Sequence, residues 1–136
     1  MLLTNKTKCV ISMIIMEWNE FININNENSL GTRKEYVYVF GDLATAHLLS
    51  QIIFWFSPGK NGQSKLRVRK DGKEWIAKKR EDWWDECCIT KNQFDRSIKI
   101  LKKYEIVETK IFKFNGEPTT HIWLNKDKLL EVLYKK

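Results

Sequence analysis

The stretch from Ile76 to Leu124 decides the fold and reads IAKKREDWWDECCITKNQFDRSIKILKKYEIVETKIFKFNGEPTTHIWL. Its beginning predicts a short helix from Lys79 to about Cys87, which Trp83 anchors in the core. Thr90 follows a tight turn and predicts the N-cap of a second helix, because its hydroxyl can accept from the free amides of the first turn. Two short helices in close succession are therefore expected.

The second helix, expected from Lys91 to Tyr104, separates an apolar stripe from a cationic face. Phe94, Ile98 and Leu101 recur at helical spacing and predict its buried side. At about 100° per residue, the remaining side chains fall on the opposite face or at the N-terminal tip. Asn92, Arg96, Lys99 and Lys103 share that opposite face, and Lys91 and Gln93 lie at the tip.

A two-stranded ribbon is expected after the second helix, from residues 106–114 and 119–124. Asn115-Gly116 joins the strands and is typical of a tight hairpin, whereas Pro118 weakens the start of the return strand. Helix, turn, helix and ribbon in this order predict an α+β fold, a winged helix-turn-helix with a three-helix core. The ribbon side chains expected to face outward are Lys110, Lys113, Asn115, Thr119, Thr120 and His121.

The third core helix is expected upstream, beginning after Asp42. Its carboxylate can cap the helix, and Pro58-Gly59 ends it. His47 lies within this helix, and a lone histidine without a partner motif is more often structural than a ligand. The helical stripe that predicts burial consists of Leu48, Leu49, Ile52, Ile53 and Phe56.

Two further elements are expected on either side of that helix. Residues 36–40 (YVYVF) are rich in aromatic and β-branched residues and predict a strand. Residues 66–77 predict a small hairpin around Asp71-Gly72, a dipeptide that tolerates the positive φ of a type I′ turn. Its exposed Arg67 and Arg69 could lie along a phosphate backbone, or could prevent a solvent-exposed edge strand from pairing with another chain.

The two ends of the chain flank the predicted winged helix. We assign residues 1–34 to an N-terminal arm, which could be part of the fold or of a dimer interface, and residues 35–136 to the winged-helix DNA-binding domain. Within the arm, Cys9 to Phe21 is compatible with a short helix, and the alternation over residues 21–25 with a strand. Residues 125–134 predict an amphipathic C-terminal helix, which either packs on the domain or forms a dimer interface.

The chain is basic, with a net charge of +7 over 136 residues. Residues 1–59 carry four Lys and Arg against five Asp and Glu, whereas residues 60–136 carry twenty against twelve. The basic excess therefore coincides with the predicted winged helix, as expected for a domain that meets phosphates. Composition alone is equally compatible with a basic, well-solvated chain.

Several classes of protein are disfavoured by the sequence. The apolar runs are too short to span a bilayer, and no cleavage site follows the first of them, so neither a membrane nor export is expected. Cys9, Cys87 and Cys88 suit a reducing cytoplasm and are interpreted as core or near-core side chains. Without a Gly-rich phosphate loop, a metal-ligand spacing or a Gly-x-Ser-x-Gly elbow, we expect no enzyme, cofactor or metal.

Residues 36–125 resemble the winged-helix proteins of low-GC Gram-positive bacteria and of their phages and plasmids. Many of these resemble the N-terminal DNA-binding domain of phage replication initiators, also called replisome organisers. The resemblance implies a winged-helix fold and does not decide among replication, transcription and partition. The residues that carry it include Leu48 to Phe56, Trp84, Ile89-Thr90, Gln93, Arg96, Ile98, Leu101, residues 106–108, and residues 112–122 around Asn115-Gly116.

Two positions depart from that group. Its members often have glycine in the turn between the two helices and again after the second helix, where this chain has Cys88 and Glu105. A non-glycine residue in the left-handed conformation costs ~1 kcal/mol. Either these turns differ from those of the group, or this chain tolerates mild strain.

The leading hypothesis is a cytoplasmic protein that binds double-stranded DNA, as a homodimer, in phage or plasmid replication initiation or in transcriptional regulation. The alternative is a protein-interaction module on the same scaffold, whose partner could be a replication or transcription protein. On the leading hypothesis, Lys91, Asn92, Gln93 and Arg96 read bases, Lys99 and Lys103 hold phosphates, and Lys110, Lys113, Asn115, Thr119 and Thr120 grip the adjacent groove.

Overall fold

A computed structural model describes residues 17–27 and 31–134 of the chain, with side chains left out for residues 24–27. The chain divides into two units, residues 1–30 and residues 31–136.

The described element of the first unit is helix α2, Trp18–Glu27, on which the exposed rings of Trp18 and Phe21 stack with their centroids 5.4 Å apart. The prediction of a strand over residues 21–25 is therefore wrong, because a helix pairs its own backbone groups where no partner strand is available. The predicted helix over residues 9–21 lies mostly outside the described residues.

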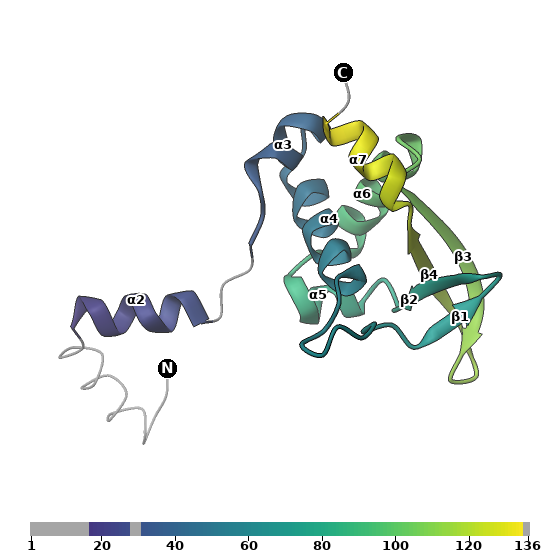
Figure 1. Cartoon of the computed structure of the whole chain (residues 1–136), viewed down its shortest axis with the longest axis horizontal. Helices are drawn as coiled ribbons and strands as arrows, with labels where there is room; N and C mark the ends of the chain where they lie inside the picture. The colour runs from purple at the N-terminus through teal and green to yellow at the C-terminus, as the bar shows by residue number, and fades with distance from the viewer. Residues whose placement is uncertain (1–16, 28–30, 135–136) are drawn as a thin grey trace. The chain divides into compact units, whose positions relative to one another are not determined.

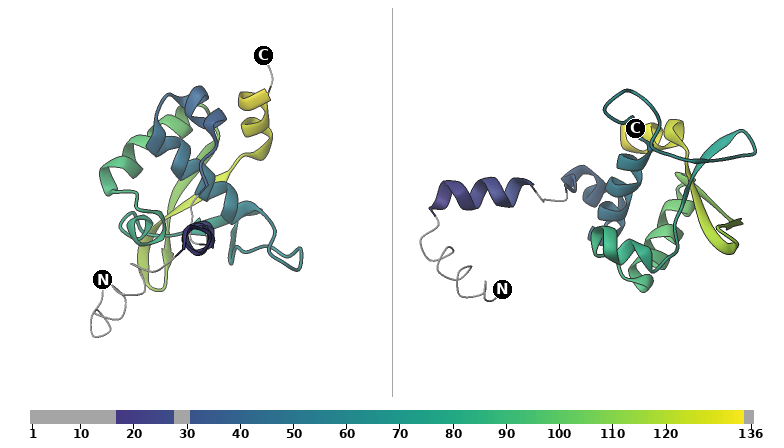
Figure 2. Two further views of the ribbon diagram at one scale, coloured as in Figure 1. Left: turned by 90° about the vertical axis from the view of Figure 1, so that its left-hand side faces the viewer. Right: turned by 90° about the horizontal axis from the view of Figure 1, so that it is seen from below.

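The second unit is a mixed α+β structure in which helices lie on one side of an antiparallel sheet (Figures 1 and 2). Its elements in chain order are α3 (Lys34–Phe40), α4 (Leu43–Phe56), β1 (Val68–Lys70), β2 (Lys73–Ala77), α5 (Asp82–Cys87), α6 (Lys91–Lys103), β3 (Val107–Phe114), β4 (Glu117–Leu124) and α7 (Lys126–Tyr134).

The sheet has the strand order β1-β2-β4-β3, so β4 lies between strands on both sides. The long β3–β4 ribbon pairs from Val107↔Leu124 to Phe114↔Glu117, and β2 joins β4 at Ile76↔Ile122. Both hairpins turn through two left-handed residues, φ 56° and 72° at Asp71-Gly72 and φ 53° and 82° at Asn115-Gly116. The two predicted hairpins are thereby confirmed.

Residues 36–40 form part of helix α3, so the predicted strand is wrong. Tyr36 and Phe40 are four residues apart and both buried, which a helix achieves by placing them on one face. Gly41 ends the helix in the left-handed conformation, and its amide donates to the carbonyl of Val37 at 2.8 Å. Packing against the core has overridden the β propensity of these aromatic and β-branched residues.

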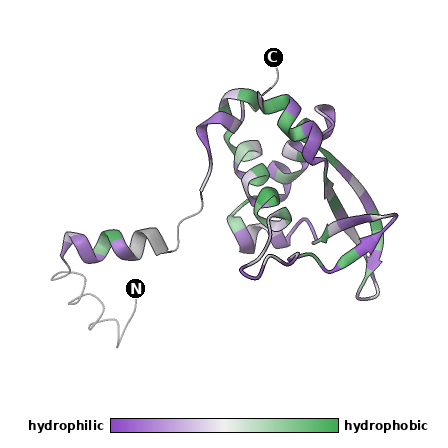
Figure 3. Cartoon of the chain, in the orientation of Figure 1, coloured by the Kyte–Doolittle hydropathy of each residue, from purple (hydrophilic) through white to green (hydrophobic). Residues whose placement is uncertain are grey.

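Helix α4 is the centre of the hydrophobic core, as predicted. Asp42 caps it by accepting from the Thr45 amide at 3.0 Å. Leu48, Leu49 and Ile52 are fully buried, and hydrophobic residues accordingly concentrate in this helix (Figure 3). The same figure shows hydrophilic residues at the tip of the β1–β2 hairpin, which carries the cationic face expected from its alternation.

Helices α5 and α6 pack through Trp83 and Phe94, whose rings stack 5.9 Å apart. Trp83 is fully buried, and Phe94, Ile98 and Leu101 form the buried side of α6, so the predicted anchor and stripe are confirmed. Helix α5 begins at Asp82, a few residues later than predicted. Among the residues that the structure describes, no helix has both the length and the apolarity needed to cross a bilayer.

The two turns that lack glycine both use the left-handed conformation. Cys88 and Glu105 each have φ 63°. The Cys88 amide donates to the carbonyl of Trp84 at 2.9 Å, and the Glu105 amide to that of Lys102 at 2.9 Å, so both residues close the end of a helix. The chain therefore keeps the turn geometry that glycine would favour and accepts the strain of a side chain there.

We expect Cys88→Gly to be more stable than Cys88→Ala by about 1 kcal/mol. Both substitutions remove an exposed thiol, but only glycine relieves the contact between Cβ and the backbone at positive φ. Urea denaturation under reducing conditions measures the difference. An alanine variant as stable as the glycine variant would show that this turn is unstrained.

Candidate nucleic-acid interface

The exposed face of α6 carries lysines that have no acidic partner. Lys91, Lys99, Lys102 and Lys103 are all exposed, and none forms an ion pair within the part of the chain that the structure describes. Lys102 and Lys103 also lie in the last turn, where positive charge favours the helix dipole. Of these, Lys102 was not among the predicted residues, because it lies beside the cationic face that carries Lys99 and Lys103. The result is a row of cations able to approach phosphates.

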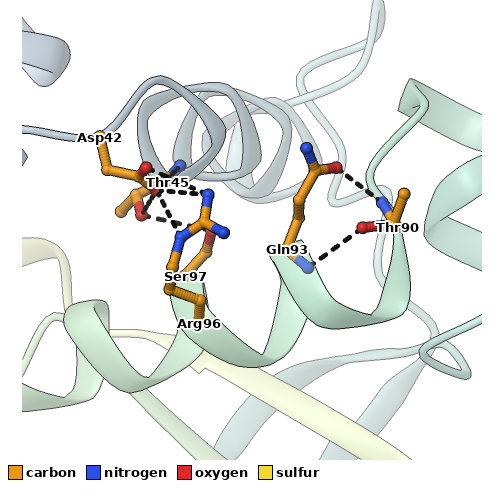
Figure 4. A network of polar contacts seen from close by, with 6 residues as sticks. All are labelled: Asp42, Thr45, Thr90, Gln93, Arg96 and Ser97. Carbon is orange, nitrogen blue, oxygen red and sulfur yellow. Dashed lines mark hydrogen bonds and ion pairs between the residues drawn. The ribbon is translucent and has the colours of Figure 1, made fainter.

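The N-terminus of α6 is closed by a capping box (Figure 4). The backbone N–H of Gln93 donates to the Thr90 hydroxyl at 3.1 Å, and the backbone N–H of Thr90 donates to Gln93 Oε1 at 2.9 Å. This confirms Thr90 as the cap. It also uses one of the two lone pairs of Gln93 Oε1 and holds that side chain against the start of the helix.

Arg96, in the middle of the exposed face, points back to the N-terminus of α4 (Figure 4). Its guanidinium lies 3.1 Å from Asp42 Oδ1 and 3.3 Å from Asp42 Oδ2. The same carboxylate accepts from the Thr45 hydroxyl at 2.6 Å. That hydroxyl lies 3.2 Å from the buried Ser97 hydroxyl, one residue after Arg96. The cap of α4 is therefore also the contact that joins α4 to α6.

The Asp42 carboxyl is held in its charged form. Partial burial alone would raise its pKa, but hydrogen bonds from Thr45 and Arg96 together with the positive charge of Arg96 lower the pKa below its usual value. Arg96 is thus engaged by an ionised partner at neutral pH. Contact with a DNA base would require it to leave Asp42.

The β3–β4 ribbon presents fewer polar side chains than the sequence predicts. Lys113 and Asn115 are exposed and make no ion pair or side-chain hydrogen bond among the described residues. Lys110 is also exposed but lies 3.5 Å from Asp71 Oδ2 and 3.7 Å from Glu108 Oε2. Thr120 is half-buried, on the side of the sheet that faces the helices.

Thr119 and His121 do not face outward, so this part of the prediction is wrong. Thr119 is 4% exposed, and its hydroxyl donates to the carbonyl of Glu117 at 3.0 Å. His121 is fully buried, with its ring 5.0 Å from that of Phe112. Strand β4 lies between β2 and β3. Trp75 of β2 and Phe112 of β3 cover the face of β4 that points away from the helices. Residues that alternate between the two faces of β4 are therefore buried on both.

Ion pairs join the segment just before α5 to α6 and to the β3–β4 ribbon. Arg80 donates to Asp95 on α6 through two hydrogen bonds of 2.9 and 2.7 Å. Lys79 pairs with Glu117 on β4 and, through that hydrogen bond, lowers the pKa of Glu117. These contacts hold α6 and the ribbon to the same short segment, so the two elements form one surface.

The histidine and cysteine side chains are structural in the described part of the chain. His47 Nε2 donates to the carbonyl of Cys87 at 2.8 Å, and Nδ1 lies 2.9 Å from the Thr32 hydroxyl. Burial raises the pKa of the Cys87 thiol to about 11. Cys88 is exposed, contrary to its assignment to the core, and Cys9 lies outside the described residues. No group of three His, Cys, Asp or Glu side chains that could hold a metal ion occurs among the described residues.

We expect Asp42→Asn to destabilise the protein by up to about 1 kcal/mol at neutral pH, because asparagine still caps the helix but cannot pair with Arg96. The contribution of the charge is present above the unfolded pKa of about 3.9 and is lost as the pH falls through the lower folded pKa. Urea denaturation of both proteins between pH ~3 and ~7 should therefore show a difference that shrinks below pH ~4. A constant difference would exclude the Arg96 contact as its source.

Comparisons of this chain with protein-family models, with curated proteins and with solved structures found no match. The geometry of α6 and the ribbon therefore carries the functional argument.

Proposed function

We propose that this chain is a winged-helix protein that binds double-stranded DNA. Helices α4, α5 and α6 correspond to the three-helix core, and the order β2-β4-β3 corresponds to the sheet that ends in the wing. The observation that carries the proposal is the row of lysines on α6 that form no ion pair with any described residue, beside a ribbon with exposed Lys113 and Asn115 at its tip. In this assignment α6 enters the major groove and the ribbon contacts the adjacent phosphates or groove.

The hydrogen bonds within the protein assign different roles to the polar residues of α6. Asn92 is exposed and keeps both the donor and the acceptor of its amide, which a two-bond contact with adenine requires. Gln93 is held by the capping box through Oε1, so contact with a base would require its side chain to keep or to give up that bond. Arg96 positions α6 on α4 through Asp42, and the lysines neutralise phosphates.

The cellular role that we propose is replication initiation or transcriptional regulation in the cytoplasm, of phage, prophage or plasmid type, without enzymatic activity. Residues 36–125 resemble winged-helix proteins of low-GC Gram-positive bacteria and of their phages and plasmids, which supports DNA binding of this type without deciding among replication, transcription and partition. The charge distribution also supports it, since the basic excess lies in residues 60–136.

The proposal is tested by fluorescence anisotropy with the DNA that flanks the gene and with shuffled DNA, over a salt series. A specific binder shows a steep decrease of log affinity with log salt and a preference of ~10³ or more for one sequence. The same slope without preference identifies a non-specific binder or a site elsewhere. Absence of binding to both duplexes at low salt would exclude the proposal.

We expect Lys99→Ala and Lys103→Ala each to weaken binding to all duplexes alike and to reduce the salt slope by about one unit, because each removes one phosphate contact. Lys126→Ala is the matched control, since Lys126 is an exposed lysine on α7 without an ion pair among the described residues. A control variant that loses as much affinity would show that net charge, and not the α6 face, drives binding.

Asn92→Ala should behave differently from the lysine variants. We expect it to lower the preference for the specific duplex by ~1–3 kcal/mol while leaving the salt slope unchanged, because a base contact releases no counterion. The anisotropy titrations above measure both quantities. Unchanged preference would remove Asn92 from the base-reading residues.

A second candidate function is association with a protein, foremost a second copy of this chain. Helices α3 and α7 pack together and leave large apolar side chains in solvent, with Tyr38 78%, Leu130 55% and Tyr134 61% exposed. Neighbouring apolar side chains of this size are typical of an interface. A homodimer formed there would present two copies of α6 to DNA.

We expect sedimentation equilibrium to give the mass of a dimer, and Leu130→Glu to shift the protein toward monomer by placing a charge in the interface. Ile111→Glu is the control, because Ile111 is equally apolar and 66% exposed but lies on β3. A monomer mass for the unaltered protein would exclude the homodimer and leave duplex binding untouched.

A further inference from the structure

A cavity of about 250 Å³ lies between the end of α4, the segment before β1, strand β2 and the tip of the ribbon. None of its lining residues belongs to α5 or α6, so it lies apart from the α6 face of the proposed duplex-binding surface, and Phe114 is the lining residue that belongs to the ribbon. Its walls are aromatic, from Trp55, Trp75 and Phe114, and its rim is cationic, from Lys65, Arg67 and Lys78.

The cavity exists because β1 and β2 separate. Their pairing begins at Val68↔Trp75 and runs to the turn, so the segment before Val68 has no ladder with the end of β2. Beyond this point β2 turns to β4, where Ala77 pairs with His121.

The three rim cations differ in their availability. Lys65 Nζ donates to the carbonyl of Phe54 at 2.7 Å, and Lys78 pairs with the carboxylate of Glu86. Arg67 is exposed and forms no ion pair or hydrogen bond through its side chain among the described residues. Its planar guanidinium is therefore free to bind an anion through two hydrogen bonds.

A second cavity of about 220 Å³ lies beside the first, at the tip of the ribbon. The two share Ala77, Lys78 and Phe114 as lining residues, so Phe114 forms part of both walls. Asp82 and Glu117 also line the second cavity, and Lys79 is paired with Glu117 there. The charges of the second cavity are therefore balanced, and the free cation beside an aromatic wall is Arg67 of the first cavity, among the described residues.

We propose that this cavity binds an unpaired nucleotide, with the base against Trp55 and Phe114 above the edge of Trp75 and the phosphate on Arg67. Aromatic walls beside a free guanidinium favour a ligand that is both aromatic and anionic. Any of the bases can stack on aromatic side chains, so the cavity is not expected to distinguish among them. The ligand can be a free nucleotide or an unpaired base of a single strand, since both offer a base joined to a phosphate.

The test uses the indole N–H resonances of the full-length protein, in which six tryptophans give distinguishable probes. Titration with deoxythymidine monophosphate, and separately with a trinucleotide of thymidines, should shift the Trp55 and Trp75 resonances saturably below ~10 mM. The Trp55 resonance is assigned with Trp55→Phe. The resonance of Trp83, which lies buried between α5 and α6, serves as the internal control for binding elsewhere.

Arg67→Ala and Phe114→Ala should each weaken binding about fivefold or more, whereas Phe114→Tyr, which keeps the ring, should retain it. Arg67 is exposed and Phe114 is 36% exposed, so neither variant removes a core side chain. Lys60→Ala removes an equal charge from an exposed loop residue that does not line the cavity, and should leave binding unchanged.

Tighter binding of the trinucleotide than of the mononucleotide identifies a single strand as the ligand, and equal binding identifies a free nucleotide. Inorganic phosphate that produces the same shifts would overturn the proposal, because a bare anion would then suffice. So would the absence of Trp55 and Trp75 shifts at ~10 mM ligand, or an equal loss of binding in Lys60→Ala. These outcomes are measured without duplex DNA, and absence of duplex binding by the unaltered protein would not change them, so each proposal can fail while the other holds.

Discussion

The contact between the Asp42 carboxylate and two helices is the interaction on which the arrangement of this domain depends. Asp42 caps α4 through Thr45 and holds Arg96 of α6, while Thr45 and the buried Ser97 meet beneath them. Buried hydroxyl groups are costly without partners, so this polar group fixes how α4 lies on α6. The apolar packing of α4 on α6 is non-directional and would tolerate other alignments.

That arrangement has a consequence for the charges of α6. Its arginine and its aspartate are both engaged within the protein, Arg96 by Asp42 and Asp95 by Arg80. The lysines remain unpaired among the described residues and form long, flexible point charges on the surface. On the proposed DNA-binding function, such a surface would neutralise phosphates without directional preference, and sequence preference would fall mainly on Asn92. Affinity and specificity would then be carried by different residues of the same helix.

The sheet supports two clusters because its middle strand is enclosed on both faces. Ile122 and Leu124 face the helices, whereas His121 packs against Phe112 and Ala77 on the outer face. The β1–β2 hairpin covers that outer face with Trp75. Only the end of β2, at Ile76 and Ala77, pairs with β4, and the rest of the hairpin extends away from it. The aromatic cavity opens where the hairpin strands part. The outer cluster and the cavity therefore have one structural cause.

Elements whose signals are local could be predicted from the order of the residues alone. The cap and stripe of α4, the cap at Thr90, the buried side of α6 and both two-residue hairpins depend on neighbours within a few residues, and their predictions are confirmed. Tertiary structure decided the rest. Residues 36–40 became a helix because Tyr36 and Phe40 share one buried face, and Thr119 and His121 turned inward because β2 lies beside β4. The partner of Arg96 is Asp42, far away in the sequence, so no periodicity of α6 could show that its guanidinium is engaged. Contacts between distant segments depend on how the elements pack, and local patterns do not encode that packing.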